Sequence, residues 1–276
     1  MKLYILISTI DEGIKKIKNI LKEPQKNIIY IVSHQYQDKK YKYIPKELLR
    51  EDILVSQIKG KGLSKNRNNA ISLVNNGICL VADDDINILP NSFNIIIDTF
   101  KKNEDLDVAC FKIKTEKNQP EYKNYPKNCS LVKKIKDKKY YVSSVEIAFR
   151  VNSIKKNKIF FNENFGIGSN IMIGGEEKVF INDCIKKNLK IMFFPYYIVQ
   201  HPFLSNIKKI RKYDNKKIIL NGGLDAETIG KLSILKALLV TIYKIPSLLK
   251  NSINPFKYLA KRLFGAFYIL KNKQKK

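Results

Sequence analysis

Tryptophan is absent from this chain of 276 residues, and histidine occurs only twice. The four cysteines form no Cys-x-x-Cys pair, so the sequence indicates neither a zinc site nor a framework of disulfides. No run of about 18 uncharged apolar residues occurs, and the apolar run Leu3–Ile7 reaches Asp11 and Glu12 too soon for a signal peptide. These absences favour a protein of the reducing cytosol and argue against a membrane-spanning helix.

Acidic residues are scarce, because 25 Asp and Glu stand against 52 Lys and Arg, a formal net charge of +27. From Thr228 to the end there are eleven basic residues and no acidic one. Elsewhere the lysines are spread among Ile and Asn residues and form no nucleic-acid-binding motif. We therefore predict no nucleic-acid partner, and a basic nucleic-acid-binding protein is the alternative from a different functional class.

Short apolar runs rich in β-formers alternate with helix-period segments over residues 3–102. This alternation predicts an α/β fold with a mostly parallel central sheet flanked by helices. Strands are expected at Leu3–Ile7, Ile28–Val32, Ile53–Gln57 and Ile78–Ala82, and helices at Glu12–Leu21, from an N-cap at Ser64 to about Asn75, and at Pro90–Lys102.

The second half of the chain shows the same kinds of segment in a less regular order. We expect a catalytic domain over residues 1–221, with a nucleotide-binding half (1–102) and an acceptor half (103–221), and a basic helical tail over 222–276. Further strands are predicted at Val108–Ile113, Tyr140–Phe149 and Ile191–Phe194, a polar loop at Glu116–Lys139, and a helix from Glu176 to about Asn188.

Three consecutive carboxylates, Asp83, Asp84 and Asp85, end the apolar run Ile78–Ala82. Like charges at the end of a buried strand are costly unless a cation neutralises them, and a divalent metal holding phosphate oxygens is the usual solution. A solvated turn is the alternative, since Asp is common in turns. The position directly after five apolar residues favours the metal site.

Polar residues also follow the first two predicted strands, at Ser8-Thr9 and Ser33–Gln35. Ligands of open parallel sheets gather outside the carboxyl ends of the strands, so these residues are expected to face the aspartates. The segment Lys59–Asn69 adds two glycines, four cations and a predicted helix start, which suits a diphosphate. A solvated lysine-rich loop is the alternative for that segment.

A second acidic pair, Glu176 and Glu177, follows Gly174-Gly175 and begins a predicted helix. Carboxylates in a first helical turn also complement the helix dipole, which is a sufficient structural explanation. His201 follows the last predicted strand, and a lone histidine is more often structural than a ligand. The acidic pair and His201 are assigned to the site only because they follow the other motifs in a particular order along the chain.

That order resembles the family 2 glycosyltransferases of the GT-A, Rossmann-like fold over residues 1 to about 203. The resemblance implies an inverting, metal-dependent transfer of a sugar from a nucleotide-diphospho-sugar, with a UDP-sugar favoured, to an acceptor hydroxyl. The segments that carry it are Ile5–Thr9, Gly62–Asn68, Val81–Asp85 with Pro90, Gly174–Glu177, Phe194-Pro195 and His201-Pro202.

The resemblance also implies roles for single residues. Glu177 stands where the family has the aspartate of a Glu-Asp pair and would be the general base, with Glu176 the other candidate. The family's aspartate after the second strand is replaced by Ser33–Gln35. Mg²⁺ or Mn²⁺ is expected on Asp83, Asp85 and His201, and the nucleotide-sugar on Ser8, Thr9, Gln35, Lys61, Arg67, Asp83 and Asp84.

The nearest alternative enzyme is a nucleotidyltransferase that forms a nucleotide-sugar. It would show a glycine-rich loop directly after the first strand, and Ser8–Glu12 lacks one.

Two segments of the tail, beginning at Leu232 and at Pro255, mix apolar residues with isolated cations. Lys236, Lys244 and Pro246 are expected to interrupt a membrane span, whereas basic amphipathic helices on an anionic membrane have this composition. We predict a peripheral enzyme at the inner face of the cell membrane, acting on a glycan or lipid-linked glycan in surface polysaccharide assembly. The alternative is a helical pair packed on the catalytic domain or on another subunit.

Overall fold

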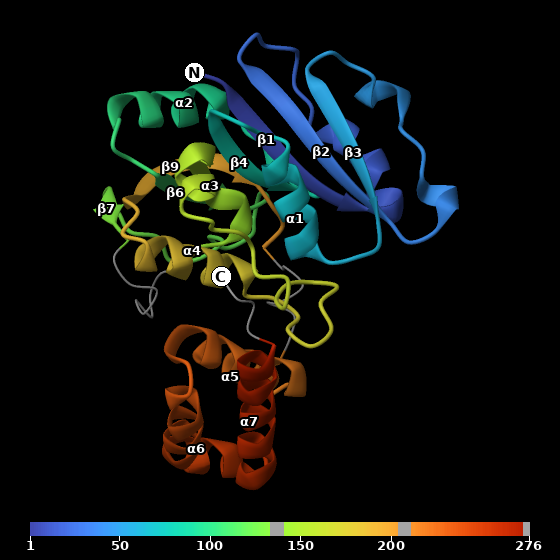
Figure 1. Cartoon of the computed structure of the whole chain (residues 1–276). Coiled ribbons are helices and arrows are strands. Elements are labelled where there is room, and N and C mark those ends of the chain that lie inside the picture. The colour runs from blue at the N-terminus through green and yellow to red at the C-terminus, as the bar shows by residue number, and fades with distance from the viewer. Residues whose placement is uncertain (133–140, 204–210, 273–276) are drawn as a thin grey trace.

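The computed structural model describes residues 1–132, 141–203 and 211–272. Within them one nine-stranded sheet forms the centre of an α/β domain (Figure 1). Its strands are β1 (Leu3–Ile10), β2 (Ile28–Tyr36), β3 (Ile53–Lys59), β4 (Ile78–Asp83), β5 (Asn87–Ile88), β6 (Val108–Lys114), β7 (Ser130–Leu131), β8 (Ile147–Arg150) and β9 (Ile191–Gln200).

The strand order is β3-β2-β1-β4-β8-β6-β9-β5, with β7 paired to β9. Strands β1 to β4 pair in parallel, and β6 pairs in parallel with β9. Strand β8 is antiparallel to both β4 and β6, so it joins the two halves of the sheet. The predicted α/β fold with a mostly parallel sheet is confirmed.

Helices cover both faces of the sheet, and each face has its own hydrophobic core. Ile14, Ile17 and Phe100 belong to the core on one face, whereas Ile71 and Phe180 belong to the core on the other. The first face is covered by the 3₁₀ helix η1 (Asp11–Asn19) and by α2 (Ser92–Lys102), and the second by α1 (Leu63–Ser72), α3 (Val151–Lys156) and α4 (Glu176–Lys186).

Two predicted helical features of the first half are wrong in detail. The expected α-helix at Glu12–Leu21 is a 3₁₀ helix, and the fully buried residues Ile14, Ile17 and Ile20 repeat every three positions, which is its period. Ser64 does not cap α1, because the N-cap is Gly62.

The second half departs further from the prediction. Only the end of the strand expected at Tyr140–Phe149 forms, because a 3₁₀ turn, η4 (Ser144–Glu146), precedes β8, and Tyr140 lies outside the described residues. Strand β9 continues past Pro195, with its register to β6 shifted between Cys110 and Lys112. A proline lacks the N–H that a regular ladder needs, so a bulge accommodates it.

The loop expected at Glu116–Lys139 is described as far as residue 132, and residues 133–139 lie outside the described part. Most of its described residues form an exposed loop, as predicted, but two features attach this loop to the domain. Tyr122 and Lys123 are buried, and β7 pairs with β9.

Three helices follow the α/β domain and lie together beneath α4 in Figure 1, as α5 (Asn215–Ile229), α6 (Leu232–Lys250) and α7 (Pro255–Lys271). A Cβ on Gly222 would overlap the Arg262 carbonyl, and one on Gly265 would overlap the Ile219 carbonyl, so the α5 and α7 backbones touch. The boundary expected after residue 221 falls inside α5. Both helical tail segments form.

Lys236, Lys244 and Pro246, which are expected to interrupt a membrane span, do not interrupt the helix, because α6 is continuous through all three. By length and composition alone α6 is apolar enough to cross a membrane, a test that buried helices of water-soluble proteins also pass. Only 22% of its apolar window is buried.

Candidate active site

Polar residues lie in register with one another at the carboxyl ends of the parallel strands. Ser8 on β1 is in register with Ser33 on β2 and with Asp83 on β4, and Ser33 is in register with Ser56 on β3. Parallel strands end at one edge, so four segments distant in sequence deliver polar groups to the same place. The predicted convergence of strand ends is confirmed.

Arg67 on α1 joins this edge to the second acidic pair. Its guanidinium donates to Asp83 Oδ1 at 2.8 Å and to Glu176 Oε1 at 2.9 Å. Arg67 is 2% exposed and Glu176 5%, so an ion triplet lies in the interior between the two halves of the domain. The planar fork of arginine suits this double contact.

The surroundings of Arg67 keep it charged. Burial by itself lowers the pKa of Arg67, but the Asp83 and Glu176 carboxylates outweigh burial and raise that pKa above its usual value. The guanidinium also lies over the Phe161 ring, 5.3 Å from its centre. Within the described residues, Arg67 Nε and Glu176 Oε2 are buried and have no hydrogen-bond partner of good geometry. Such buried unpaired atoms are rare, and here two of them belong to one ion triplet.

Two asparagines of α1, three positions apart and on one helix face, connect the helix to the strand ends. Asn66 donates to the Thr9 carbonyl at 2.9 Å and accepts from the Ser33 hydroxyl at 2.5 Å. Asn69 donates to Ser33 Oγ at 2.8 Å and to Ser56 Oγ at 3.0 Å. The sequence analysis did not select these residues, although the Asn-rich run after Arg67 was their signal.

Thr9 and Asp84 form a pair at the end of β1. The Thr9 hydroxyl donates to Asp84 Oδ2 at 2.5 Å. Burial raises the pKa of Asp84, and the Thr9 hydrogen bond opposes that shift. A Cβ on Gly13 would overlap the ends of both side chains, so a larger residue at this position would have to displace the pair. Asp84 is thus a structural partner of Thr9 in this structure.

The polar residues after β2 are buried. His34 Nδ1 accepts from Gln57 Nε2 at 3.1 Å, and Nε2 then donates to the Asp11 carbonyl at 3.0 Å. Burial lowers the pKa of His34, which favours this neutral form. Gln35 is 1% exposed and Ser8 4%, and among the described residues Gln35 Nε2 and Ser8 Oγ have no hydrogen-bond partner. Both side chains stay candidates for ligand contact.

Asp11 is a residue that the sequence analysis used only against a signal peptide. Its φ of 49° is left-handed. Its carboxylate accepts from the Gln37 backbone at 2.8 Å and from Gln37 Nε2 at 2.9 Å. This contact ties the loops after β1 and β2 together, where the family's aspartate is missing.

The expected metal ligands are only partly assembled. Asp85 Oδ1 lies 3.6 Å from His201 Nε2, whereas Asp83 is engaged by Arg67. Among residues 1–132, 141–203 and 211–272, no three His, Cys, Asp or Glu side chains form a group that would hold a metal ion. The expected set of Asp83, Asp85 and His201 is therefore not present as a preformed site.

Asp85 and His201 nevertheless suit a divalent cation whose other ligands come from a diphosphate. His201 Nδ1 lies 2.7 Å from the Pro202 carbonyl and donates to it, because a carbonyl only accepts. The lone pair of Nε2 then faces Asp85, the arrangement usual for a histidine that ligates a metal. Asp85 is half exposed, at 54% of its side chain, and so is accessible to a ligand.

Glu177 follows Glu176 in the first turn of α4 and is partly exposed. Burial, and then the charge of Glu176, raise the pKa of Glu177 to about 8, against an opposing effect of Arg67. Glu176 is held by Arg67 at Oε1, whereas no ion pair involves Glu177 among the described residues. A carboxylate with a raised pKa is suited to accept a proton near neutral pH.

The loop before α4 closes over the start of α1. The Leu63 N–H donates to the Ile167 carbonyl at 2.9 Å, and the Ser64 hydroxyl donates to the Phe165 carbonyl at 2.6 Å. Lys61 is exposed between Gly60 and Gly62, whose φ angles are both left-handed. Lys61 is thus free to turn toward a phosphate, but the first amide of α1 is already used.

A family model described as glycosyl transferase family 2 matches residues 7–174, more than half of the chain. The chain belongs to glycosyl transferase family 2. The matched residues include Arg67, Asp83 and Asp85. This protein is therefore a glycosyltransferase that uses a nucleotide-sugar. No curated protein matches the chain.

Solved structures of S. aureus TarS share the fold of this glycosyltransferase. The TarS 1-349 structure is 13% identical with a TM-score of 0.62, over 100% of this chain and 93% of that one. The TarS 1-349 complex with UDP-GlcNAc gives 12% identity and a TM-score of 0.61, with the same coverage. A longer TarS structure is 16% identical with a TM-score of 0.57, and the match covers 99% of this chain and 55% of that one. At such identities the likeness establishes the GT-A fold alone.

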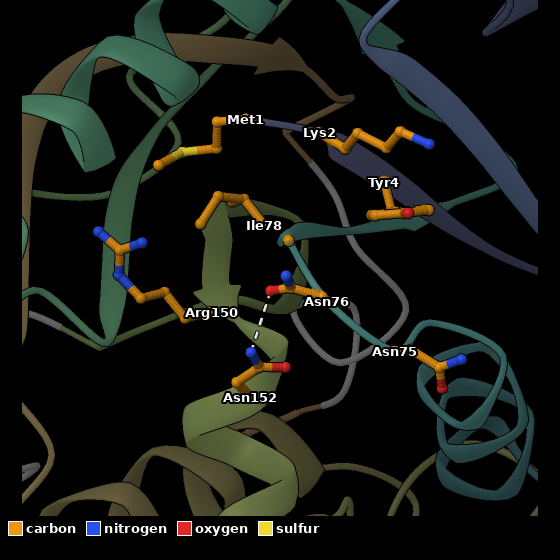
Figure 2. A pocket seen from close by; sticks show the side chains of 9 residues that line it. Met1, Lys2, Tyr4, Asn75, Asn76, Ile78, Arg150 and Asn152 are labelled. Atoms are coloured by element: carbon orange, nitrogen blue, oxygen red, sulfur yellow. Dashed lines mark hydrogen bonds between the residues drawn. The ribbon is translucent and has the colours of Figure 1, made fainter.

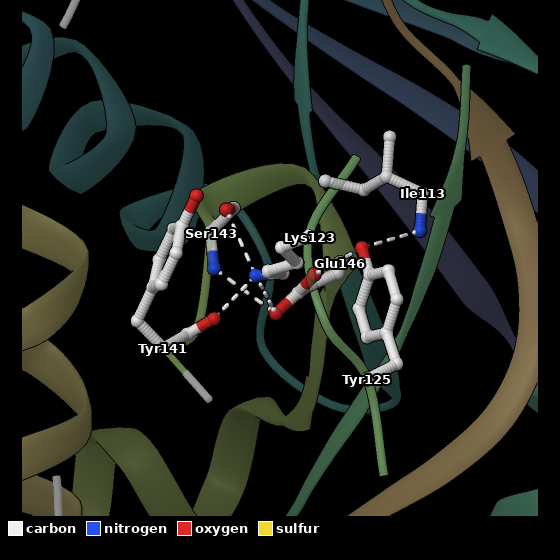
Figure 3. A network of polar contacts seen from close by, with 6 residues as sticks. All are labelled: Ile113, Lys123, Tyr125, Tyr141, Ser143 and Glu146. Atoms are coloured by element: carbon white, nitrogen blue, oxygen red, sulfur yellow. Dashed lines mark hydrogen bonds and ion pairs between the residues drawn. The ribbon is translucent and has the colours of Figure 1, made fainter. Parts of the chain in front are cut away.

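A buried polar network lies in the second half of the α/β domain of the glycosyltransferase (Figure 3). Lys123 donates to Glu146 Oε1 at 2.8 Å and to Ser143 Oγ at 3.0 Å, and also to the Tyr141 carbonyl. Tyr125 donates to Glu146 Oε2 at 3.2 Å and accepts from the backbone of β6. The network attaches two loop segments to the sheet, and Glu146 and Lys123 are the charged members among the six residues that Figure 3 draws.

Lys123→Met is expected to lower the free energy of unfolding by about 3 kcal/mol, because it removes the cation that lies 2.8 Å from the fully buried Glu146 carboxylate. Urea denaturation measures the loss. The double variant Lys123→Met/Glu146→Gln should be more stable than Lys123→Met alone, since it also removes the charge of the buried carboxylate. Equal losses in both variants would contradict the ion-pair explanation.

A pocket of about 520 Å³ lies at the opposite edge of the sheet, at the amino ends of β1 and β4 (Figure 2). Its walls include Lys2, Asn76 and Arg150. Arg150 there donates to the carbonyls of Phe100 and Leu106, so it closes the end of α2. Asp83 lies at the other end of β4 from this pocket, and none of the described residues that line the pocket is acidic, so we do not assign the donor to it.

Proposed function

We propose that this glycosyltransferase transfers a sugar from a UDP-sugar to an acceptor hydroxyl with inversion and with the help of a divalent cation. The observation that carries the proposal is the ion triplet of Asp83, Arg67 and Glu176. It places the aspartates after β4 beside the carboxylates that begin α4. The complexes of TarS with UDP and with UDP-GlcNAc support the choice of nucleotide.

Glu177 acts as the general base in this proposal. Its carboxylate takes a proton from the acceptor hydroxyl while that oxygen attacks the anomeric carbon from the face opposite the diphosphate. The bond from the sugar to the diphosphate breaks as the new glycosidic bond forms, so a single displacement inverts the configuration. Glu176 holds Arg67 and acts as a positioning residue.

The leaving diphosphate gains negative charge during the displacement. Asp85 and His201 would hold Mg²⁺ or Mn²⁺, which when bound supplies positive charge to the diphosphate. Lys61 contributes a cation from the β3–α1 turn. Ser8, Gln35 and Thr9 line the nucleotide side, and the orphaned polar atoms of Ser8 and Gln35 would find partners there.

The acceptor of this proposal is a glycan or lipid-linked glycan in surface polysaccharide assembly, at the cytoplasmic face of the cell membrane. The support is the basic, apolar composition of residues 228–276. A membrane-bound acceptor and a membrane-attached enzyme meet on one surface, which raises their effective concentration.

A thermal-shift screen tests the donor class. UDP with Mn²⁺ at about 100 times its Kd should raise the Tm by roughly 5–10 °C, whereas GDP, CDP and TDP should have smaller effects. Asp85→Ala should lose the part of the shift that depends on Mn²⁺.

Asp98→Ala, an exposed aspartate of α2, is the matched control and should respond as the wild type does. No shift with any nucleotide would contradict the proposal. A UDP shift that is independent of Mn²⁺ would contradict the metal dependence alone.

A further inference from the structure

Over its first turns, helix α6 buries small side chains and exposes large apolar ones, whereas near its end Leu248 is buried. Ser233, Ala237 and Thr241 repeat every four residues and are no more than 5% exposed. A helix on the surface of a water-soluble domain normally shows the reverse arrangement. Small residues between helices and large apolar residues outside are typical of contact with lipid. The outward side carries Leu232, Leu235, Leu239, Ile242, Tyr243 and Leu249, which are between 55% and 85% exposed.

Helix α7 extends this exposed apolar surface. Phe256, Phe264 and Phe267 are 82%, 50% and 52% exposed. Single exposed apolar residues are normal on a protein, but so many on two helices that pack together are not. The surface therefore needs an occupant.

The excess of positive charge around this apolar surface indicates which kind of partner covers it. No acidic residue follows Glu227, and Asp225 is already paired with Lys236 and Arg262. The remaining cations complement anionic headgroups, whereas a second copy of the chain would bring like charges together. Exposed lysines stand at the ends of the two helices, at Lys231, Lys250, Lys257 and Lys271.

The helices are fixed to the catalytic domain. Met172, from the loop that covers α1, packs so closely on Gly223 of α5 that a Cβ there would overlap its thioether. Phe165 of the same loop belongs to one apolar cluster with residues of α5 and α7. Because α6 also packs against α5 and α7, crossing a bilayer would cost those contacts, and lying in the interface retains them.

We infer that the outward side of α6, continued by the exposed phenylalanines of α7, lies in the headgroup region of an anionic lipid leaflet. The apolar side chains enter the acyl boundary, and the flanking lysines contact phosphates. This inference deepens the membrane partner proposed above by naming the surface, and it does not depend on which nucleotide-sugar is the donor.

Sedimentation of the full chain with vesicles tests the surface. We expect binding to vesicles of phosphatidylcholine with phosphatidylglycerol and much weaker binding to phosphatidylcholine alone. Leu239→Asn/Tyr243→Asn should bind the anionic vesicles at least tenfold more weakly. Lys250→Gln/Lys257→Gln should bind them roughly 30-fold more weakly.

Matched controls lie on the α/β domain. Leu49→Asn/Leu54→Asn changes two exposed leucines, and Lys101→Gln/Lys102→Gln two exposed lysines. All four variants should keep the Tm of the wild type and its thermal shift with UDP, so that a failure of vesicle binding is distinguished from a failure of the donor assignment.

Three results would overturn the inference. One is the absence of wild-type binding to anionic vesicles, and another is an equal effect of the control and surface variants. The third is a change of oligomeric state in Leu239→Asn/Tyr243→Asn with vesicle binding unchanged, which would identify a second copy as the occupant.

Discussion

Glu177→Gln is expected to lower kcat by about 10²–10⁴ with little change in the KM for the donor, because a general base acts only in the transition state. Glutamine keeps the shape of the side chain but does not accept the proton. Single-turnover transfer with a radiolabelled donor measures the step. Glu177→Asp restores the residue usual in the family and should retain most of the activity.

Turnover of Glu177→Gln within a few fold of the wild type would contradict this assignment. Glu176→Gln distinguishes the two carboxylates, because Glu176 is bound to Arg67 and its loss should affect stability and donor binding more than the chemical step. A fall confined to kcat in Glu176→Gln would exchange the two roles.

The same base predicts a pH dependence. Burial and the charge of Glu176 raise the pKa of Glu177 to about 8, and only the deprotonated carboxylate accepts a proton. We therefore expect kcat/KM of the free enzyme to rise with pH up to about pH 8 and then level off. The increase of kcat/KM with pH should disappear in Glu177→Gln, whereas Glu177→Asp should still show an increase. A wild-type profile that is flat from about pH 6 to about pH 9 would be inconsistent with a base of this pKa.

Arg67→Met is expected to lower the free energy of unfolding by about 3–5 kcal/mol, the largest loss of stability that we predict. Methionine fills much of the same space, but the buried Glu176 and the partly buried Asp83 lose their shared cation. Urea denaturation measures the loss, and the binding of UDP should weaken with it.

A variant that also removes the two carboxylate charges distinguishes the electrostatic loss of stability from the loss of packing. Arg67→Met/Asp83→Asn/Glu176→Gln should regain stability relative to Arg67→Met, because neutral amides replace the unpaired carboxylates. Arg67→Lys keeps the charge but loses the planar fork that reaches both acids, so it should lie between the wild type and Arg67→Met. Full stability in Arg67→Met would refute the structural role of the triplet.

Elements with a simple period could be predicted from the sequence, and those shaped by distant contacts could not. The first four strands form where the apolar runs are, because a short continuous apolar run, of the kind that a sheet covered on both faces buries, is visible in the local sequence. Strand β8 begins later than predicted, because Glu146 turns inward to Lys123 and η4 replaces the start of the strand. The isoleucines of η1 fit a helical pattern, but their spacing of three is that of the 3₁₀ form.

The sequence by itself determined the family, the carboxylates at the end of β4, the acidic pair at the start of α4 and the basic apolar tail. Only the tertiary structure decided which charges meet. Arg67 lies 16 residues from Asp83 and 109 residues from Glu176, and no local pattern relates such positions. It likewise decided that Asp84 pairs with Thr9 and that α6 turns its large apolar side outward. Composition records how many apolar and charged groups a segment has, whereas the direction each side chain faces depends on what packs against the segment.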